Sequence, residues 1–379
     1  MSTRRLPGAV HVACMIDIAI SVGLTIFVLA NIMNLGGLLL WVERKGSAVL
    51  QDRIGANRAA LLGKLPINVG IINTLVADPI KLFTKEDFIP PNADKLLHAL
   101  APALAMVPAL ISFIAIPIGD VLIIGDRVIN LQAANLNVGI LYILGMVSLG
   151  VYGIVLAGWA SNNRWALLGG IRASAQMISY EIAMGLALIG VIMVFGTLDL
   201  QEIARAQGHL IGGVLPGWGI FYQPVAFFIF LAAGIAESKR VPFDLPEAES
   251  ELISGYFTEY SGAKQATFML VDFLESIVVA GLVTTLFFGG WQAPFLARDG
   301  FHFPGGAFYP VPSLLVTLLQ LGSFVTKLVL FCWLQIMIRW TLPRFRYDQL
   351  INLGWKGLLP ISLANILVTA LVMIIFQAD

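Results

Sequence analysis

The chain has 379 residues, of which 58% are apolar and only 12% are charged. Soluble domains carry about 25% charged residues, so this chain lacks the polar surface that a water-soluble protein of its length needs. Its 23 basic and 23 acidic side chains cancel and form no basic stripe, which excludes a nucleic-acid binder. The apolar residues gather in long runs, which excludes a disordered chain and is typical of a polytopic membrane protein.

Eight apolar segments are long enough, or nearly long enough, to cross a bilayer, which takes roughly 20 residues. Prolines interrupt or bound the second and the fifth of them, at Pro102, Pro108, Pro117 and Pro224. We therefore expect an all-α, polytopic membrane protein that forms a single domain over residues 1–379, with eight transmembrane helices. The expected spans lie at about 16–42, 97–117, 138–160, 177–196, 220–236, 270–289, 312–334 and 357–376.

The lysine and arginine residues predict the orientation, because cytoplasmic loops carry an excess of them. The loops after the first, third, fifth and seventh spans hold 17, whereas the other loops and the termini together hold 5. We expect these four loops to face the cytoplasm and both termini to lie on the outer side. Arg4 and Arg5 precede the first span and favour the opposite orientation, but they are outnumbered.

The first cytoplasmic loop contains an apolar stretch from Leu61 to Val76, with polar residues such as Lys64 and Asn68 interleaved. Its apolar residues recur at helical spacing, which predicts an amphipathic helix lying along the membrane surface. A short re-entrant segment is the alternative interpretation.

Ionisable residues in or beside the spans point to function, because a charge at the centre of a membrane helix costs about 2.5–3.5 kcal/mol. Acidic residues end the first and fifth spans and open the fourth and sixth, while a lysine lies inside the seventh. These residues are Glu43, Glu181, Glu237, Asp272, Glu275 and Lys327.

The loop after the fifth span reads AESKRVPFDLPEAESELISGYFTEYSG and is strongly acidic. One interpretation is a helix start, with Asp244 as the N-cap and Glu247 completing a capping box. This interpretation explains Glu249, Glu251 and Glu259 poorly. Acidic side chains four residues apart, such as Glu247 and Glu251, repel each other on one helix face. Because crowding and desolvation raise carboxylate pKa values, the second interpretation is a pathway for protons or cations.

Motifs that hold redox groups are missing from the sequence. There is no G-x-G-x-x-G turn, Walker loop, H-E-x-x-H helix or serine elbow. The two cysteines, Cys14 and Cys332, are too few for an iron–sulfur cluster, which usually takes four. We predict no metal, nicotinamide or flavin site in this chain, so any redox centres would belong to partner proteins.

Five charged blocks in the predicted cytoplasmic loops carry a resemblance to a known family. They are Glu43–Arg58, Ala77–Glu86, Gly158–Glu181, Ala236–Gly262 and Ile338–Pro360. In these blocks the chain resembles the H-type subunit (mitochondrial subunit one) of proton-pumping NADH:quinone oxidoreductase, respiratory complex I. The homologous membrane subunit of membrane-bound hydrogenases and an ion-coupled transporter are the alternatives.

The resemblance implies a subunit with eight membrane helices that joins the hydrophilic arm to the antiporter-like membrane subunits. Quinone, in this case ubiquinone, is the implied substrate. FMN and the iron–sulfur clusters are implied to lie in partner subunits, and the peripheral quinone-site subunits are implied partners together with membrane lipid. The implied location is the bacterial inner membrane.

The resemblance also implies a quinone tunnel framed by the first span, the interfacial helix and the sixth span. The implied tunnel and rim residues are Glu43, Arg44, Arg53, Asp78, Lys81, Phe83, Arg240, Asp244, Arg344 and Arg346. The implied proton path comprises Glu181, Glu237, Glu247, Glu249, Glu251, Glu259, Asp272 and Lys327. The chain departs from the family pattern at Ala56, where a proline is usual, and at Asp272, where a glutamate is usual.

Overall fold

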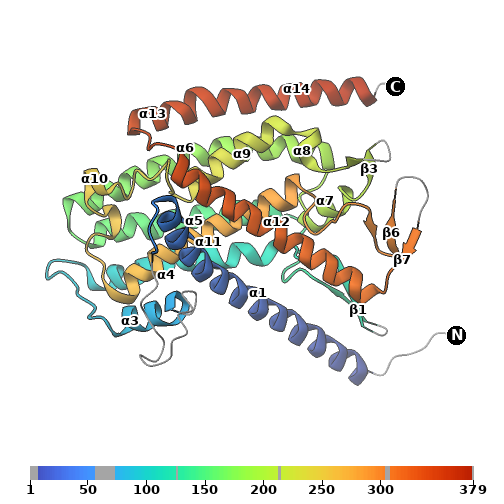
Figure 1. The fold of residues 1–379 in the computed structure, drawn as a ribbon, viewed down its shortest axis with the longest axis horizontal. Helices are drawn as coiled ribbons and strands as arrows, with labels where there is room; N and C mark the ends of the chain where they lie inside the picture. The colour runs from blue at the N-terminus through green and yellow to red at the C-terminus, as the bar shows by residue number, and fades with distance from the viewer. Residues whose placement is uncertain (1–6, 56–72, 125–126, 212–214, 304–307, 378–379) are drawn as a thin grey trace.

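The structure is a computed structural model that describes residues 7–55, 73–124, 127–211, 215–303 and 308–377. Long helices run lengthwise between two ends of the molecule (Figure 1). We call one the α10 end, since it holds the short helices α3 (Asp78–Thr84) and α10 (Glu249–Leu252), and the other the hairpin end, since it holds the strands β1 to β7.

Seven helices among the described residues are long and apolar enough to cross a membrane. They are α1 (Pro7–Leu50), α4 (Lys95–Ser112) with the 3-10 turn Phe113–Ala115, α5 (Gly139–Ala160), α6 (Arg164–Phe195), α11 (Gly262–Phe287), α12 (Ser313–Thr341), and the continuous run of α13 (Tyr347–Asn352), a π-helical segment (Leu353–Leu358) and α14 (Leu359–Gln377). The all-α class of the prediction is confirmed.

The fifth predicted span is shorter than expected. It divides at Gln223 into α8 (Gly219–Tyr222) and α9 (Pro224–Glu237), and α9 has 14 residues. At 1.5 Å per residue this gives roughly 21 Å, short of the roughly 30 Å of a hydrocarbon core. Helix α9 still runs from the hairpin end towards the α10 end, and the start of α1 and the end of α14 share the hairpin end (Figure 1). The eight-span count therefore stays a prediction.

The small remaining elements lie in the connections. The helical ones are α7 (Leu200–Ala206), the π-turn Asn73–Ala77 and the 3-10 turn Gly255–Phe257. The strands pair antiparallel, as β1 (Val121–Ile124) with β2 (Arg127–Asn130), β3 (Leu210–Ile211) with β4 (Leu215–Pro216), and β6 (Gly300–His302) with both β5 (Leu296–Ala297) and β7 (Phe308–Pro310).

Several helices extend past the predicted spans into the charged blocks. Helix α6 begins at Arg164 instead of about residue 177, because the Asn163 side chain accepts a hydrogen bond from the Trp165 amide and caps the helix. Hydropathy marks only the apolar part of such a helix, so Glu181 lies in the middle of α6 and not at its start.

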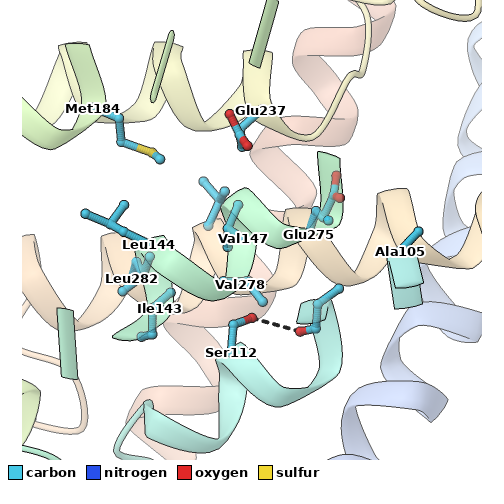
Figure 2. Close-up of a pocket in the computed structure, with 13 residues that line it drawn as sticks. Ala105, Ser112, Ile143, Leu144, Val147, Met184, Glu237, Glu275, Val278 and Leu282 are labelled. Atoms are coloured by element: carbon cyan, nitrogen blue, oxygen red, sulfur yellow. Dashed lines mark hydrogen bonds between the residues drawn. The ribbon is translucent and has the colours of Figure 1, made fainter. Parts of the chain in front are cut away.

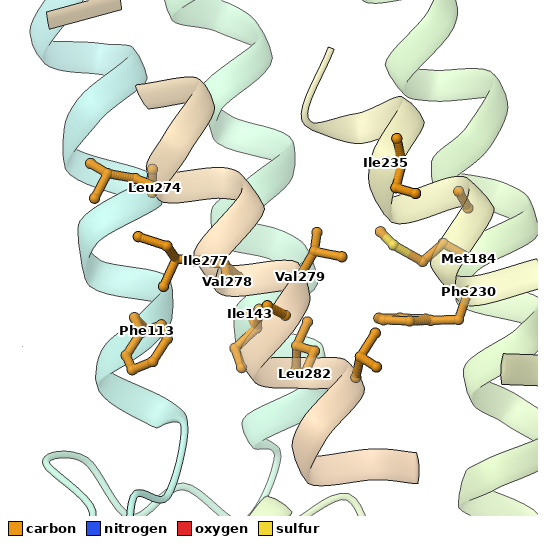
Figure 3. Close-up of a cluster of buried hydrophobic side chains, with 14 of the residues drawn as sticks. Phe113, Ile143, Met184, Phe230, Ile235, Leu274, Ile277, Val278, Val279 and Leu282 are labelled. Carbon is orange, nitrogen blue, oxygen red and sulfur yellow. The ribbon is translucent and has the colours of Figure 1, made fainter. Parts of the chain in front are cut away.

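Helix α11 is the centre of the bundle. Its apolar window is 78% buried, against 11% for α1 and for α13–α14, which therefore present apolar faces outward. Ile277, Val278 and Leu282 of α11 are buried among side chains of the surrounding helices, including Phe113 and Phe230 (Figure 3). Residues on α11 are consequently held far from bulk water.

The predicted interfacial helix, Leu61–Val76, lies mostly outside the described residues. The described remainder begins at Asn73 with a π-helical turn that leads into α3. Helix α1 packs closely on both this turn and α11, because a Cβ on Gly37 would be 2.6 Å from Leu75, and one on Gly36 would be 3.0 Å from Leu270. The described elements implied to frame a quinone tunnel thus lie together.

Candidate functional site

The loop between α9 and α11, residues 238–261, folds into the protein and not along its surface. Gln176 of α6 donates two hydrogen bonds of 2.8 Å to the carbonyl oxygens of Ala236 and Phe243, which fixes the loop to α6. At Gly255 the backbone has a φ of +58°, and a Cβ there would overlap the Pro246 carbonyl oxygen, so only glycine allows this approach. We call residues 238–261 the inner loop.

Lys239 of the inner loop is the buried cation of the site. Its side chain is fully buried, and its Nζ lies 2.6 Å from Glu275 Oε2 and 3.4 Å from Asp272 Oδ1, both on α11. Burial lowers the pKa of Lys239, but the attraction of Glu275 and Asp272 outweighs it, and the pKa is raised. The ammonium is therefore permanently charged and holds two carboxylates of α11 beside the loop.

Two further acidic side chains of the inner loop lie on the α10 side of Lys239. Tyr256 Oη donates to Glu247 Oε1 at 3.2 Å, and burial, then Asp272 and Asp244, raise the pKa of Glu247 well above its usual value. Arg344 Nη2 lies 2.8 Å from Asp244 Oδ2. Burial raises the pKa of Asp244 to about 6, even though Arg344 opposes the shift. Both groups are thus able to exchange protons near neutral pH.

Glu43 joins three elements at the edge of this cluster. Arg240 Nη1 of the inner loop lies 3.2 Å from Glu43 Oε2, and Arg339 of α12 pairs with Glu43 Oε1. The Arg240 guanidinium also stacks 3.7 Å from the ring centroid of Phe273. This ion pair network ties α1 and α12 to the inner loop.

Two more acids lie deeper in the bundle. Glu237 is 1% exposed, and neither carboxyl oxygen has a hydrogen-bond partner among the described residues. Glu237 and Glu275 line a cavity with room for about one water, and Figure 2 shows the two side chains on separate helices around it. Glu181 of α6 accepts a hydrogen bond from Ser148 of α5.

The structure therefore joins several predicted site residues into one row, which we call the acid row. It runs from the α10 side of the inner loop into the bundle, and its members are Asp244, Glu247, Asp272, Glu275, Glu237 and Glu181, with Lys239 in the middle. Glu237 is electrostatically coupled to both Glu275 and Glu181, and Glu247 to both Asp272 and Asp244.

The other predicted path residues lie apart from the acid row. Glu251 pairs with Arg172 at 2.6 Å and is half exposed, and Glu259 accepts from Asn163 at 2.7 Å. Lys327 donates to the carbonyl oxygens of Phe288, Gly290 and Gln292, where it caps the C-terminal end of α11 and contacts no carboxylate among the described residues. The Glu249 side chain lies outside the described part of the chain.

The predicted rim residues divide in the same way. Arg44 of α1 lies 2.5 Å from Asp78 of α3, and Lys81 Nζ lies 3.6 Å from Asp78. Phe83 on the same helix is 78% exposed. By contrast, Arg53 contacts Gln51, and the Arg346 amide donates to its neighbour Gln349.

Sequence reasoning did not assign a role to Lys239, Glu275 or Arg339. Lys239 follows a span directly, and such a lysine is ordinarily an orientation signal exposed on the cytoplasmic side. Its burial depends on the inner loop folding inward, which no hydropathy pattern registers. The observation that an acid, Glu275, lies on the sixth span without a cation on the same span was the available signal.

These features define a class: a multi-pass α-helical membrane protein with a buried row of carboxyl groups around one lysine. The family model described as NADH dehydrogenase matches residues 22–370. The chain belongs to this family, which confirms the predicted resemblance.

Curated relatives are similar over nearly their full length, and all are H-type subunits of NADH-quinone oxidoreductase. The first of two such proteins from Cytophaga hutchinsonii is 44% identical over 336 residues, covering 89% of this chain and 91% of the relative. The second of two from Geobacter sulfurreducens is 45% identical over 358 residues, covering 94% and 98%. The protein from Bdellovibrio bacteriovorus is 42% identical over 365 residues, covering 89% and 92%.

Proposed function

We propose that the chain is the H-type membrane-arm subunit of a proton-translocating NADH-quinone oxidoreductase. In this role it links quinone reduction, which takes place at the joint with the peripheral arm, to proton movement in the membrane arm. The observation that carries the proposal is the acid row, in which the inner loop brings Glu247 and Asp244 beside the carboxyl groups of α11.

The chemistry of quinone reduction requires such a row. A quinone that gains two electrons takes up two protons, so its reduction changes the charge beside the α10 end of the protein. Buried carboxyl groups that interact strongly titrate as a coupled set, and a change at one end is answered at the next group. Asp244 and Glu247, with raised pKa values, would receive this change first, and Glu237 and Glu181 would carry it into the bundle.

The α10 end also supplies the elements for quinone entry. Helix α1, the turn before α3, and α11 pack together, and the Arg44–Asp78 ion pair joins α1 to α3. Arg44, Asp78 and Lys81 would form the polar rim of the tunnel, with exposed Phe83 beside them. The rim would be completed by Arg53 and Arg346, and Glu43, Arg240 and Arg344 would hold its inner wall to the acid row.

Other components follow from the same proposal. The α10 end would face the cytoplasm of a bacterial inner membrane and contact the peripheral subunits that hold FMN and the iron–sulfur clusters. The apolar outer faces of α1 and α14 would contact lipid and neighbouring membrane subunits. Ubiquinone is the proposed substrate, and Glu249, Glu251, Glu259 and Lys327 are proposed as peripheral members of the proton path.

The proposal is tested by purifying the complex through a tag on this chain and assaying NADH:quinone reductase activity and proton pumping. In the Glu247→Gln variant we expect both to fall by about 100-fold, the range in which a lost proton-transfer group acts, with the complex still assembled. Glu202→Gln, at an exposed acid of α7 near the hairpin end, is the matched control. Unchanged activity and pumping in Glu247→Gln would contradict the proposal, as would a hydrogenase-type set of partners or a chain that purifies alone.

A further inference from the structure

Lys239 divides the acid row into two parts. On the α10 side lie Glu247 and Asp244, and on the bundle side lie Glu237 and Glu181. The lysine cannot leave this position easily, because it is fully buried and its backbone, with a φ of +53°, turns sharply out of the end of α9. The row is thus interrupted by a cation that the fold itself holds in place.

The charges around Lys239 do not balance. One ammonium lies between the two carboxylates of Asp272 and Glu275, at 3.4 Å and 2.6 Å, which leaves one net negative charge in a dry environment. The charged and titratable groups facing this unit come from α9, the inner loop, α6, α11 and α12. They are Glu237, Arg240, Asp244, Glu247, Tyr256, Glu181, Asp272, Glu275 and Arg339.

This imbalance determines which acids are ionised. The two carboxylates that touch Lys239 are stabilised as anions by the ion pairs. Glu237 faces Glu275 across the cavity and has no hydrogen-bond partner among the described residues, so a second anion there would be unpaired and it holds a proton instead. Glu247 is in the same position on the other side, beside Asp272.

We propose that Lys239 is a positioning residue for proton transfer: by pairing with Glu275 and Asp272 it keeps these two ionised and sets the pH at which Glu247 and Glu237 exchange protons across them. The inference rests on the proposed function of the chain. It adds a residue pair, Lys239–Glu275, whose charges control the row without carrying protons themselves.

The test compares Lys239→Met, Glu275→Gln and the double variant in the intact complex in membrane vesicles. The measurement is the pH profile of inhibitor-sensitive NADH:quinone reductase activity and of proton pumping. Removing the cation raises the pKa of nearby carboxyl groups, so Lys239→Met should move the profile to higher pH by about 1 unit, because a close opposite charge shifts a carboxyl pKa by about 1–3 units. Removing the anion should move it to lower pH, and the double variant should return it close to that of the unmodified complex.

Matched controls separate electrostatics from packing. Lys239→Arg retains the charge and should retain the profile, and Lys95→Met, at the exposed start of α4, should not move it. If both single variants lower activity at every pH without opposite shifts, or if the double variant is worse than either, Lys239 is merely structural and the inference is overturned. If Lys239→Met does not assemble, Glu275→Gln must still shift the profile to lower pH, and an unmoved profile overturns the inference.

The two proposals fail differently. Failure of the proposed function is a purified complex without inhibitor-sensitive quinone reduction, or a Glu247→Gln variant with full activity. Failure of the inference about Lys239 is an active complex whose pH profile ignores the charges at positions 239 and 275.

Discussion

Two buried charge clusters lie at opposite ends of the molecule, and they differ in their balance. At the hairpin end Asp120 is 2% exposed and is fully matched, with Arg205 at 2.8 Å, Arg298 at 2.6 Å and Gln201 at 3.3 Å. In the acid row the carboxyl groups outnumber the cations, and both oxygens of Glu237 have no partner among the described residues. A cluster with every acid matched stabilises a fold, whereas a cluster with surplus acids has protons to exchange.

The largest expected effect comes from removing the acid that ties the row to its surroundings. Glu43→Ala leaves Arg240, which is 7% exposed, and Arg339 without their carboxylate. Breaking a buried ion pair by removing one partner costs about 3–5 kcal/mol. We expect a sharp loss of assembled complex, measured by native electrophoresis and thermal unfolding. A fully assembled Glu43→Ala complex of normal stability would contradict the network described here.

At the hairpin end a smaller and purely structural effect is expected. Asp120→Ala removes the acid shared by Arg205 and Arg298, but these arginines reach solvent, being 40% and 63% exposed. We expect a loss of about 1–3 kcal/mol, the range for a lost hydrogen bond to a charged group, and an unchanged pH profile of quinone reduction. A shifted profile would break the distinction between the two clusters.

The pH dependence of stability sharpens the comparison further. The pKa of Asp244 is raised from 3.8 to about 6, mainly by burial, so the folded protein retains a proton that the unfolded chain has lost. Ionised Asp244 therefore destabilises the fold, and stability is lost as the pH rises from about 4 to 6. Relative to Asp244→Asn, the unmodified complex should have a melting temperature that falls across this window. A constant difference between the two would contradict the raised pKa.

The smallest effect is expected at the surface of the inner loop. Glu251 is half exposed in its ion pair with Arg172, and such pairs contribute about 0.2–1 kcal/mol. Glu251→Gln should therefore lower activity by at most about five-fold, well below the effect of Glu247→Gln in the same assay. An equal loss in the two variants would place Glu251 inside the row.

The positions of the long helices could be predicted from the sequence because long apolar runs have few alternatives in a membrane. The helix ends could not, since α6 and α11 continue into polar residues that hydropathy does not mark. Glu237, Glu247 and Asp272 were recognised as candidates from their places beside spans. Their arrangement around Lys239 was not, because the ion pair joins residues 36 positions apart and forms only once the inner loop is folded inward.

Helix α11 also takes part in both clusters' surroundings, since Lys327 caps one of its ends while Asp272 and Glu275 face the inner loop. With 78% of its apolar window enclosed by other helices, it has no space in which to slide or rotate. A change of charge on quinone is therefore answered by side-chain rotamers and by the inner loop around a stationary helix. In mechanical terms α11 is the stator of the protein, and the 238–261 segment is its moving contact.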